Sequence, residues 1–393
     1  FQPPPPYIMA SEATDWPAQE ALKARRDGLK ARIEKLKERK KAAEAAQEAE
    51  PHYLIVLCHG LSGTANDLNY LKRAIDNLAT ATTPSSGEGL PGFRRVLVHG
   101  SSCNVGKTFE GVEAAGLRLA EEVLSLVETF PRLQQISFVG HSLGGLLARY
   151  AIAVLYHKEG DAERVCSLDP LYFVTTVSPH LGEPNIKHVT AVLGQTGHDI
   201  ALLPRVSEPP LLFQLCTTRT FLDPLAAFKR RRLYSNVQGD TMVPFWTAAI
   251  EIGENGDHND GARILGRFTA KATRYEIGER GCEHELMTFE QEAFTVPEDS
   301  EAASSSAASQ LVALTNAVPS QLTAMAQGLN SVGWSKVAVK LRVSLWRPHT
   351  WLPLAHARLI ANERKGLLSL ISSLLEDGQP VMDDLAKYVL GQG

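Results

Sequence analysis

The stretch Ile136-Ser-Phe-Val-Gly-His-Ser-Leu-Gly-Gly-Leu-Leu147 decides the fold of this chain. An apolar run typical of a buried strand ends at Gly140, a serine follows at position 142, and a helical pattern begins at once. A serine on so sharp a turn has a strained backbone that lifts its hydroxyl clear of the sheet. Side chains two positions before and after the serine would collide with the turn, and Gly140 and Gly144 have none. The pattern therefore predicts a nucleophilic serine at position 142.

Strand, turn and helix in this order form the nucleophile elbow of α/β-hydrolases, and the rest of the chain supports that fold class. The helical patterns cover 66–78 and 111–130, and the strand patterns cover 53–58, 94–99, 172–178, 232–238 and 336–346. Such alternation predicts a mostly parallel central sheet with helices on both faces. In residues 183–230, prolines interrupt short apolar runs, which predicts a cap or lid insertion above Ser142. Its apolar side chains are expected either to line an acyl pocket or to pack the cap against the core.

Two segments lie outside this α/β pattern. Residues 1–50 combine a proline-rich start with a charged helical extension in which Leu22, Leu29 and Leu36 fall seven apart. This spacing covers too few heptads for a coiled coil, so we expect a solvated lead-in helix rather than a partner-binding or membrane-surface helix. The hydrolase-like domain then covers 51–393, with a low-complexity insertion at about 297–310 that we expect to be disordered.

Composition and charge exclude several classes of function. With 44% hydrophobic and 21% charged residues and a formal net charge of −4, the chain gives no electrostatic reason to expect nucleic acid as a partner. It contains no H-E-x-x-H, no phosphate-binding G-x-x-x-x-G-K-S/T and no dinucleotide fingerprint, so no metal or organic cofactor is expected. Five scattered cysteines favour free thiols and an intracellular location, in the cytoplasm or an organelle. The sequence begins with Phe1, so a targeting peptide before it stays an open alternative.

The oxyanion hole has candidates in two places. The predicted strand 53–58 runs directly into His59-Gly-Leu-Ser-Gly63, where a glycine allows a sharp loop that aims a backbone N–H at the developing alkoxide. We expect the donors to be the N–H groups of Leu61 and Leu143, the latter following the nucleophile. A second His-Gly pair stands at 99–100, but its position relative to the elbow is less suitable. The supporting loop and elbow residues are His59, Gly60, Gly140, His141 and Gly144.

The acid and base of a catalytic triad should follow the nucleophile in the order Asp or Glu, then His. Asp240 stands just after the predicted strand 232–238, whereas Asp257 and Asp260 lie in a turn-rich stretch with no strand before them. Asp240 is therefore the expected acid, accepting the Nδ1–H of the histidine. Two histidines follow the last predicted strand, His349 and His356, and the residues alone do not decide between them.

The chain resembles the lipase-like serine esterases among eukaryotic α/β-hydrolases. The resemblance rests on matching segments over about residues 53–250 and 335–390, which are Val56–Gly63, Lys107–Gly111, Leu117–Ala120, Phe138–Gly145, Val177–Gly182, Gly194–Gly197, Leu233–Val237, Asp240–Val243 and Ala355-His356. It implies that Asp240 is the acid and that His356, in its Ala-His pair, is the base. The N-terminal helix and residues 251–327 depart from the family pattern.

The resemblance implies hydrolysis of a lipid ester, such as an acylglycerol or a phospholipid, through an acyl-enzyme intermediate. Such a substrate is compatible with transient association with a membrane surface. An acyltransferase would use the same triad and pass the acyl group to an alcohol instead of water. A non-catalytic reading, in which the fold serves as a binding module through residues 1–50, is the third hypothesis, because fold does not fix function.

Overall fold

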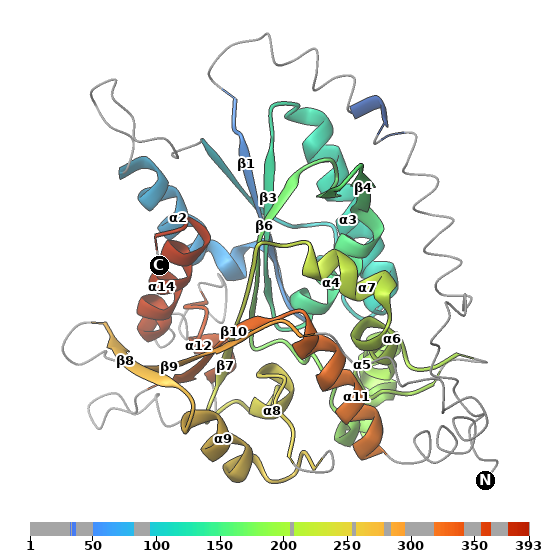
Figure 1. The fold of residues 1–393 in the computed structure, drawn as a ribbon, viewed down its shortest axis with the longest axis vertical. Coiled ribbons are helices and arrows are strands. Elements are labelled where there is room, and N and C mark those ends of the chain that lie inside the picture. The colour runs from blue at the N-terminus through green and yellow to red at the C-terminus, as the bar shows by residue number, and fades with distance from the viewer. Residues whose placement is uncertain are drawn as a thin grey trace.

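The centre of the computed structural model is an eight-stranded sheet with the strand order β2-β1-β3-β6-β7-β10-β9-β8 (Figure 1). The structure describes residues 32, 34–36, 50–81, 95–204, 208–253, 257–278, 284–294, 318–341, 355–362 and 376–392. The insertion predicted at 297–310 and the alternative base His349 lie outside these residues.

The first six strands of the sheet are parallel, as the sequence predicts for an α/β-hydrolase. They are β2 (Val96–Gly100), β1 (Tyr53–Cys58), β3 (Gln135–His141), β6 (Asp169–Thr176), β7 (Arg230–Asn236) and β10 (Trp334–Lys340). The register pairs Cys58 with Gly140 and His141 with Thr176, so three neighbouring strands end together. Ser142 follows at this carboxyl edge of the sheet, which is where ligands of open α/β sheets bind.

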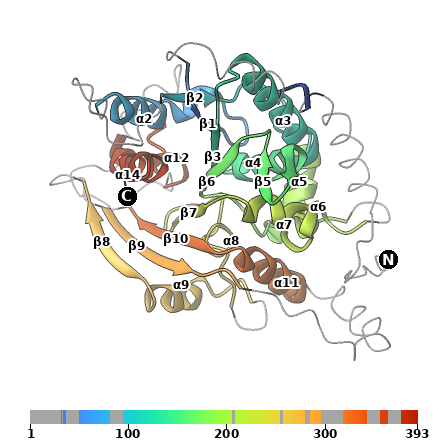
Figure 2. The ribbon, with the colours of Figure 1, turned by 45° about the horizontal axis from the view of Figure 1, so that its top comes forward.

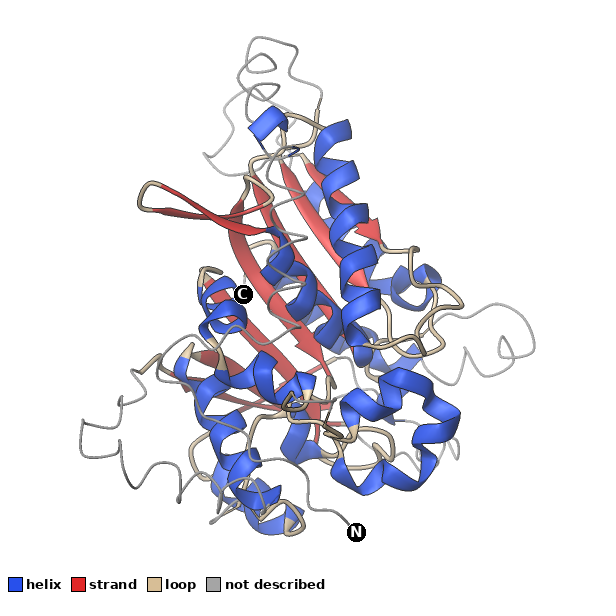
Figure 3. Ribbon diagram, turned by 90° about the vertical axis from the view of Figure 1, so that its right-hand side faces the viewer, coloured by secondary structure: helices blue, strands red, loops and turns tan. Residues whose placement is uncertain are grey.

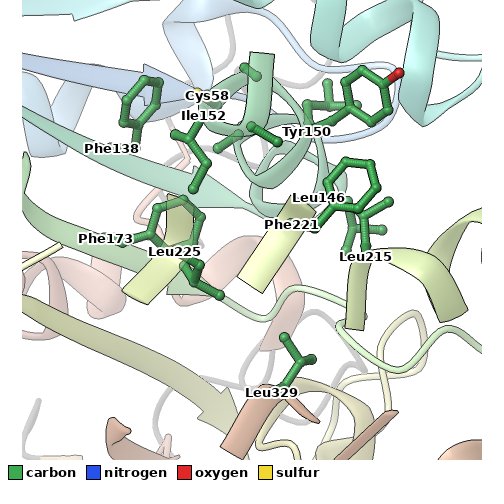
Figure 4. Packing of buried hydrophobic residues seen from close by; sticks show 14 of the residues in the cluster. Cys58, Phe138, Leu146, Tyr150, Ile152, Phe173, Leu215, Phe221, Leu225 and Leu329 are labelled. Atoms are coloured by element: carbon green, nitrogen blue, oxygen red, sulfur yellow. The ribbon is translucent and has the colours of Figure 1, made fainter. Parts of the chain in front are cut away.

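Helices cover both faces of the sheet (Figure 2). Alternate residues of β1 enter two different cores: Leu54 and Val56 join one apolar cluster, and Ile55 and Leu57 join the other. The first cluster contains apolar residues of α3 (Val112–Thr129) and α4 (Leu143–Leu155), and the second contains those of α2 (Asn69–Ala81) and α14 (Gln379–Val389). Aromatic and aliphatic side chains interdigitate in the first cluster (Figure 4). The central sheet lies between two layers of helices (Figure 3).

Two parts of the sheet structure were not predicted from the sequence. β9 (His284–Gln291) pairs antiparallel with β10, and β8 (Thr273–Ile277) pairs antiparallel with β9. A small separate hairpin, β4 (Tyr156–Glu159) and β5 (Ala162–Val165), follows α4. These strands are short or mixed in polarity, so they lack the apolar runs by which the central strands are recognised.

The segment 183–230, for which the sequence predicts a cap, is largely helical where the structure describes it, and several of its apolar residues pack in the first core cluster. Its elements are η2 (Pro184–Val189), α5 (Thr190–Ile200), α6 (Leu211–Thr217) and α7 (Arg219–Ala226). Leu212, Leu215 and Phe221 are almost fully buried in that cluster. The other short elements are η1 (Ala65–Leu68), α8 (Phe245–Ala248), α9 (Gly261–Thr269), α11 (Val318–Ser331), α12 (Ala355–Arg358) and η6 (Glu376–Gly378).

The described part of the N-terminal helix packs against the hydrolase domain, which differs from the solvated helix that the sequence favours. Leu36 is 1% exposed and belongs to the first core cluster. The Arg32 guanidinium donates two hydrogen bonds to the Glu128 carboxylate, of 2.9 and 2.7 Å, at the end of α3. Among the described residues, no helix has the length and apolar character needed to cross a bilayer.

Two helical glycines allow a matched test of how closely α11 packs against α6. A Cβ atom at Gly328 in α11 would collide with the Cys216 carbonyl group of α6, whereas a Cβ at Gly266 in α9 meets nothing within 4 Å. We expect Gly328→Ala to lower the free energy of unfolding by about 1–3 kcal/mol through overpacking. Gly266→Ala should raise it by about 0.5–1 kcal/mol, because alanine loses less backbone entropy in a helix. Urea unfolding of both variants measures this, and equal effects would contradict the close contact of α11 with α6.

Candidate active site

Ser142 occupies the strained turn that the sequence predicts between β3 and α4. Its backbone has φ 53° and ψ −126°, a conformation that a residue with a side chain adopts only where the surrounding structure enforces it. The Ser142 N–H donates a 2.8 Å hydrogen bond to the Thr176 carbonyl at the end of β6. This bond ties the turn to the neighbouring strand. The side chain is 7% exposed, at the carboxyl edge of the sheet.

The glycines on either side of Ser142 are needed for steric reasons. A Cβ at Gly140 would lie 2.5 Å from the Cα of Gly145, and one at Gly144 would collide with the carbonyl group of Cys58. Gly145 is a third such position, because its Cβ would collide with the Ser178 hydroxyl. The elbow therefore depends on Gly140 and Gly144, as predicted, and also on Gly145.

The loop that follows β1 lies directly against Ser142. A Cβ at Gly60 would be 2.8 Å from the Cβ of Ser142 and 3.3 Å from its Oγ. Residues 60–63 form a tight turn, closed by a 3.0 Å bond from the Gly63 N–H to the Gly60 carbonyl, with Ser62 at φ 51°. Leu61 occupies the second position of this turn.

The second expected oxyanion donor, the N–H of Leu143, belongs to the first residue of α4. The first N–H groups of a helix have no acceptor within the helix, so they are available to an anion. His59 supports the opposite loop: its Nδ1 lies 3.0 Å from the Gly60 carbonyl, and the ring is 1% exposed.

Asp240 lies in the turn after β7, where four donors surround its carboxylate. Oδ1 accepts the N–H groups of Met242, at 3.0 Å, and Val243, at 2.9 Å. Oδ2 accepts the Asn236 amide at 3.0 Å and lies 3.0 Å from the Nδ1 of His356. Because an ionised carboxylate can only accept, the bond requires the proton on Nδ1 and leaves Nε2 of His356 as a base.

The same contacts determine the charge of this acid. Burial raises the pKa of Asp240, but the hydrogen bond and the charge of His356, together with the Val243 N–H and the Asn236 amide, outweigh burial and lower the pKa below its usual value. The carboxylate therefore stays ionised at neutral pH, as the partner of an imidazolium must.

His356 also contacts the elbow. It belongs to α12, whose first N–H, that of Ala355, donates to the Gly239 carbonyl at 3.3 Å. The His356 ring packs on the ring of His141, with 4.8 Å between the centroids. His141 is in turn held by a 3.1 Å contact between its Nδ1 and the Thr176 hydroxyl. The structure thus brings Asp240 and His356 together beside the residue that precedes Ser142.

The other acids considered from the sequence have local partners. Asp257 accepts the N–H of Asn259, and Asp260 accepts the N–H of Arg263 at the start of α9. Asn236 is a site residue that the sequence analysis did not single out, although it ends a strand four residues before Asp240. In the described part of the chain, no group of three or more His, Cys, Asp or Glu side chains could hold a metal ion.

Fold and elbow together define an α/β-hydrolase with a serine at the nucleophile position. Residues 48–251 match the family described as "Putative serine esterase (DUF676)". This is more than half of the chain, and the chain belongs to this family.

Curated relatives and solved structures are similar to parts of the chain. The chain is 34% identical over 206 residues to "Putative lipase ROG1" of Saccharomyces cerevisiae, and 31% identical over 221 residues to "Putative lipase C4A8.10" of Schizosaccharomyces pombe. These matches cover 50% and 52% of the chain, but only 28% and 27% of the relatives' lengths. The crystal structure of the Bacillus licheniformis lipase BlEst2 in propeptide form matches at 14% identity and a TM-score of 0.29, over 57% of this chain and 41% of that one.

The lowered pKa of Asp240 predicts a pH-dependent contribution to stability. A carboxyl whose pKa is lower in the folded state stabilises the fold above its unfolded pKa, of about 3.9, and this contribution is lost as the pH falls through the folded value. In urea unfolding at a series of pH values, we expect Asp240→Asn to be less stable than wild type at pH 7. The difference should shrink below about pH 4.

Asp76 in α2 provides a control of opposite sign, because burial raises its pKa. Asp76→Asn should therefore match or exceed wild-type stability at pH 7, with any advantage declining toward acidic pH. A gap between wild type and Asp240→Asn that is constant from pH 7 to pH 3 would contradict the ionised Asp240–His356 pair.

Proposed function

We propose that this protein hydrolyses carboxylic esters through a Ser142–His356–Asp240 triad. The observation that carries the proposal is the 3.0 Å bond between Asp240 and the Nδ1 of His356, on a ring that contacts the residue before the strained Ser142. Nε2 of His356 takes the proton of Ser142 while Oγ attacks the acyl carbon, and a tetrahedral oxyanion forms. The N–H groups of Leu61 and Leu143 donate to this oxyanion.

The reaction then proceeds in two stages, acylation of Ser142 and hydrolysis of the acyl-enzyme. The imidazolium of His356 gives its proton to the alcohol oxygen, which leaves as Ser142 becomes acylated. A water molecule, deprotonated by His356, then attacks the acyl carbon. The bond from this carbon to Oγ breaks, Oγ takes the proton back from His356, and the carboxylic acid leaves. Ionised Asp240 stabilises the imidazolium in both stages.

We propose further that the substrate is a lipid ester. Two relatives that match half of this chain carry the name "Putative lipase". The exposed large apolar side chains also support this substrate class. Of five among the described residues, four belong to segments that follow the carboxyl ends of the parallel strands, the edge where Ser142 lies: Val105, Phe109, Val192 and Met242. Apolar side chains around a site mark a surface suited to lipid.

The triad is tested with a fluorophosphonate probe and with hydrolysis of p-nitrophenyl butyrate. We expect wild type to be labelled, and Ser142→Ala and His356→Ala to lose labelling and about 10⁴-fold or more in kcat. His349→Ala is the matched histidine control and should keep both activities. Loss of labelling in His349→Ala but not in His356→Ala would contradict the assignment of the base. An unlabelled and inactive wild type would contradict the hydrolase proposal as a whole.

The lipid surface is tested at Val192, which is 78% exposed. Val192→Glu should reduce hydrolysis of an emulsified triacylglycerol by about tenfold, because a charge opposes adsorption to the lipid surface. Its activity on dissolved p-nitrophenyl butyrate should be unchanged. Phe294→Glu is the control, because Phe294 is also exposed but its N–H bonds Ser331, near the start of β10 at the opposite edge. Equal activity of both variants on the emulsion would contradict adsorption through this face.

A further inference from the structure

Two motifs that the triad does not explain are hydrogen-bonded to each other. Lys107-Thr-Phe-Glu-Gly111 lies in the loop between β2 and α3, and Gly194-Gln-Thr-Gly197 lies in the cap helix α5. The Thr196 hydroxyl donates to the Thr108 carbonyl, at 2.7 Å, and accepts the Gly111 N–H, at 2.9 Å. The Thr196 N–H also donates to the Phe109 carbonyl at 3.3 Å. One threonine of the cap thus satisfies three backbone groups of the loop.

A carboxylate adds to this attachment. Oδ2 of Asp199, two residues beyond the cap motif, accepts the N–H of Val112 at 2.8 Å, at the first residue of α3. A negative charge at a helix N-terminus is favourable, because the first N–H groups lack helical acceptors and the helix dipole is positive there. Asp199 is 2% exposed and Thr196 is fully buried, so water does not compete for these bonds.

Glycines allow the two motifs to approach so closely. A Cβ at Gly194 would lie 2.7 Å from the Phe109 carbonyl oxygen, and one at Gly111 would lie 2.7 Å from the Cγ of Gln195. Both glycines have positive φ, of 57° and 98°. The pattern of these motifs is therefore explained by their mutual contact.

The loop motif contacts the oxyanion turn through Thr108. The Thr108 hydroxyl accepts the N–H of Ser62 at 2.9 Å, and Thr108 is fully buried. Ser62 directly follows Leu61 in the turn that lies against Ser142, and its φ of 51° needs external support. The bond fixes the peptide plane between Leu61 and Ser62, next to the plane that carries the Leu61 N–H.

We propose that Thr108 is a positioning residue for the oxyanion hole, and that the cap sets its position through Thr196 and Asp199. The proposal rests on the ester hydrolysis proposed above. The cap helix α5, the loop 107–111 and the turn 60–63 then act as one hydrogen-bonded unit. Displacement of α5 moves the oxyanion donor, so full activity requires the cap to be seated on the loop.

The first test removes only the acceptor for Ser62. Valine matches the shape of threonine without its hydroxyl, so Thr108→Val should lower kcat for p-nitrophenyl butyrate by about tenfold, with KM within about twofold. Complete loss of one oxyanion donor costs about 100- to 1000-fold, which sets the upper limit for a displaced one. Thr108→Ser keeps the hydroxyl and should restore kcat to near the wild-type value.

A second readout separates positioning from general destabilisation. A trifluoromethyl ketone adds to Ser142 as a tetrahedral oxyanion, so its inhibition constant should rise in Thr108→Val by the same factor by which kcat/KM falls. Thr247→Val is the matched control, because the buried Thr247 hydroxyl accepts a backbone N–H, that of Leu181, at 3.0 Å. It should lower the melting temperature comparably and leave kcat and inhibitor affinity unchanged.

The cap is tested by Thr196→Val, which leaves Thr108 in place and keeps the inference testable if Thr108→Val does not fold. It should lower kcat in the same way, and the double variant should lose less than the product of the two single losses, because both residues act on one turn. Unchanged kcat and inhibitor affinity in Thr108→Val or Thr196→Val, with an active wild type, would overturn this inference alone. An inactive wild type would instead overturn the proposed function.

Discussion

The close crossing of strand β3 and helix α4 is the constraint on which the rest of the structure depends. With 2.5 Å between a hypothetical Cβ at Gly140 and the Cα of Gly145, the helix begins in contact with the strand that it follows. This crossing forces the backbone of Ser142 out of the usual regions, and the bond to Thr176 keeps it there. All 13 residues of α4 are buried, so Ser142 stands at the start of a fully enclosed helix.

The buried helix α4 contains one charged residue, Arg149, which connects the elbow helix to the cap segment. The Arg149 guanidinium donates to the Leu215 carbonyl in α6, at 2.7 Å, and to the His180 carbonyl after β6, at 3.4 Å. Burial, and then the charge of Arg149, lower the pKa of His180, which keeps that ring neutral beside the guanidinium. A buried cation is tolerable only when dipoles replace its hydration. The cap segment is therefore held by the helix that begins after Ser142 as well as by the loop 107–111.

Local requirements explain which features could be predicted from the sequence. The elbow, the parallel strands and the turn at Asp240 each depend on residues within one short segment. Their patterns can therefore be recognised in the sequence before the fold is known. The choice between His349 and His356 is not local. His356 bonds to an acid 116 residues away, and both histidines follow the same predicted strand. Residue patterns alone therefore left the base open, and it was the resemblance to known esterases that favoured His356.

The unpredicted strands and the partners of the buried motifs also depend on contacts between segments that are distant in the sequence. β8 is a mostly exposed edge strand of five residues in which the charged Arg274 and Glu276 alternate with Thr273, Tyr275 and Ile277. Charges of this kind protect a sheet edge, and they leave too few apolar residues for the strand to be recognised from the sequence. The seven-residue spacing that includes Leu36 fits a solvated helix and a packed helix equally well, and only the folded structure places Leu36 in the first core cluster. In the cap, glycine, threonine and aspartate indicate an irregular, hydrogen-bonded segment, but not its partner. The partner is a loop more than 80 residues earlier, so it becomes visible only when the chain is folded.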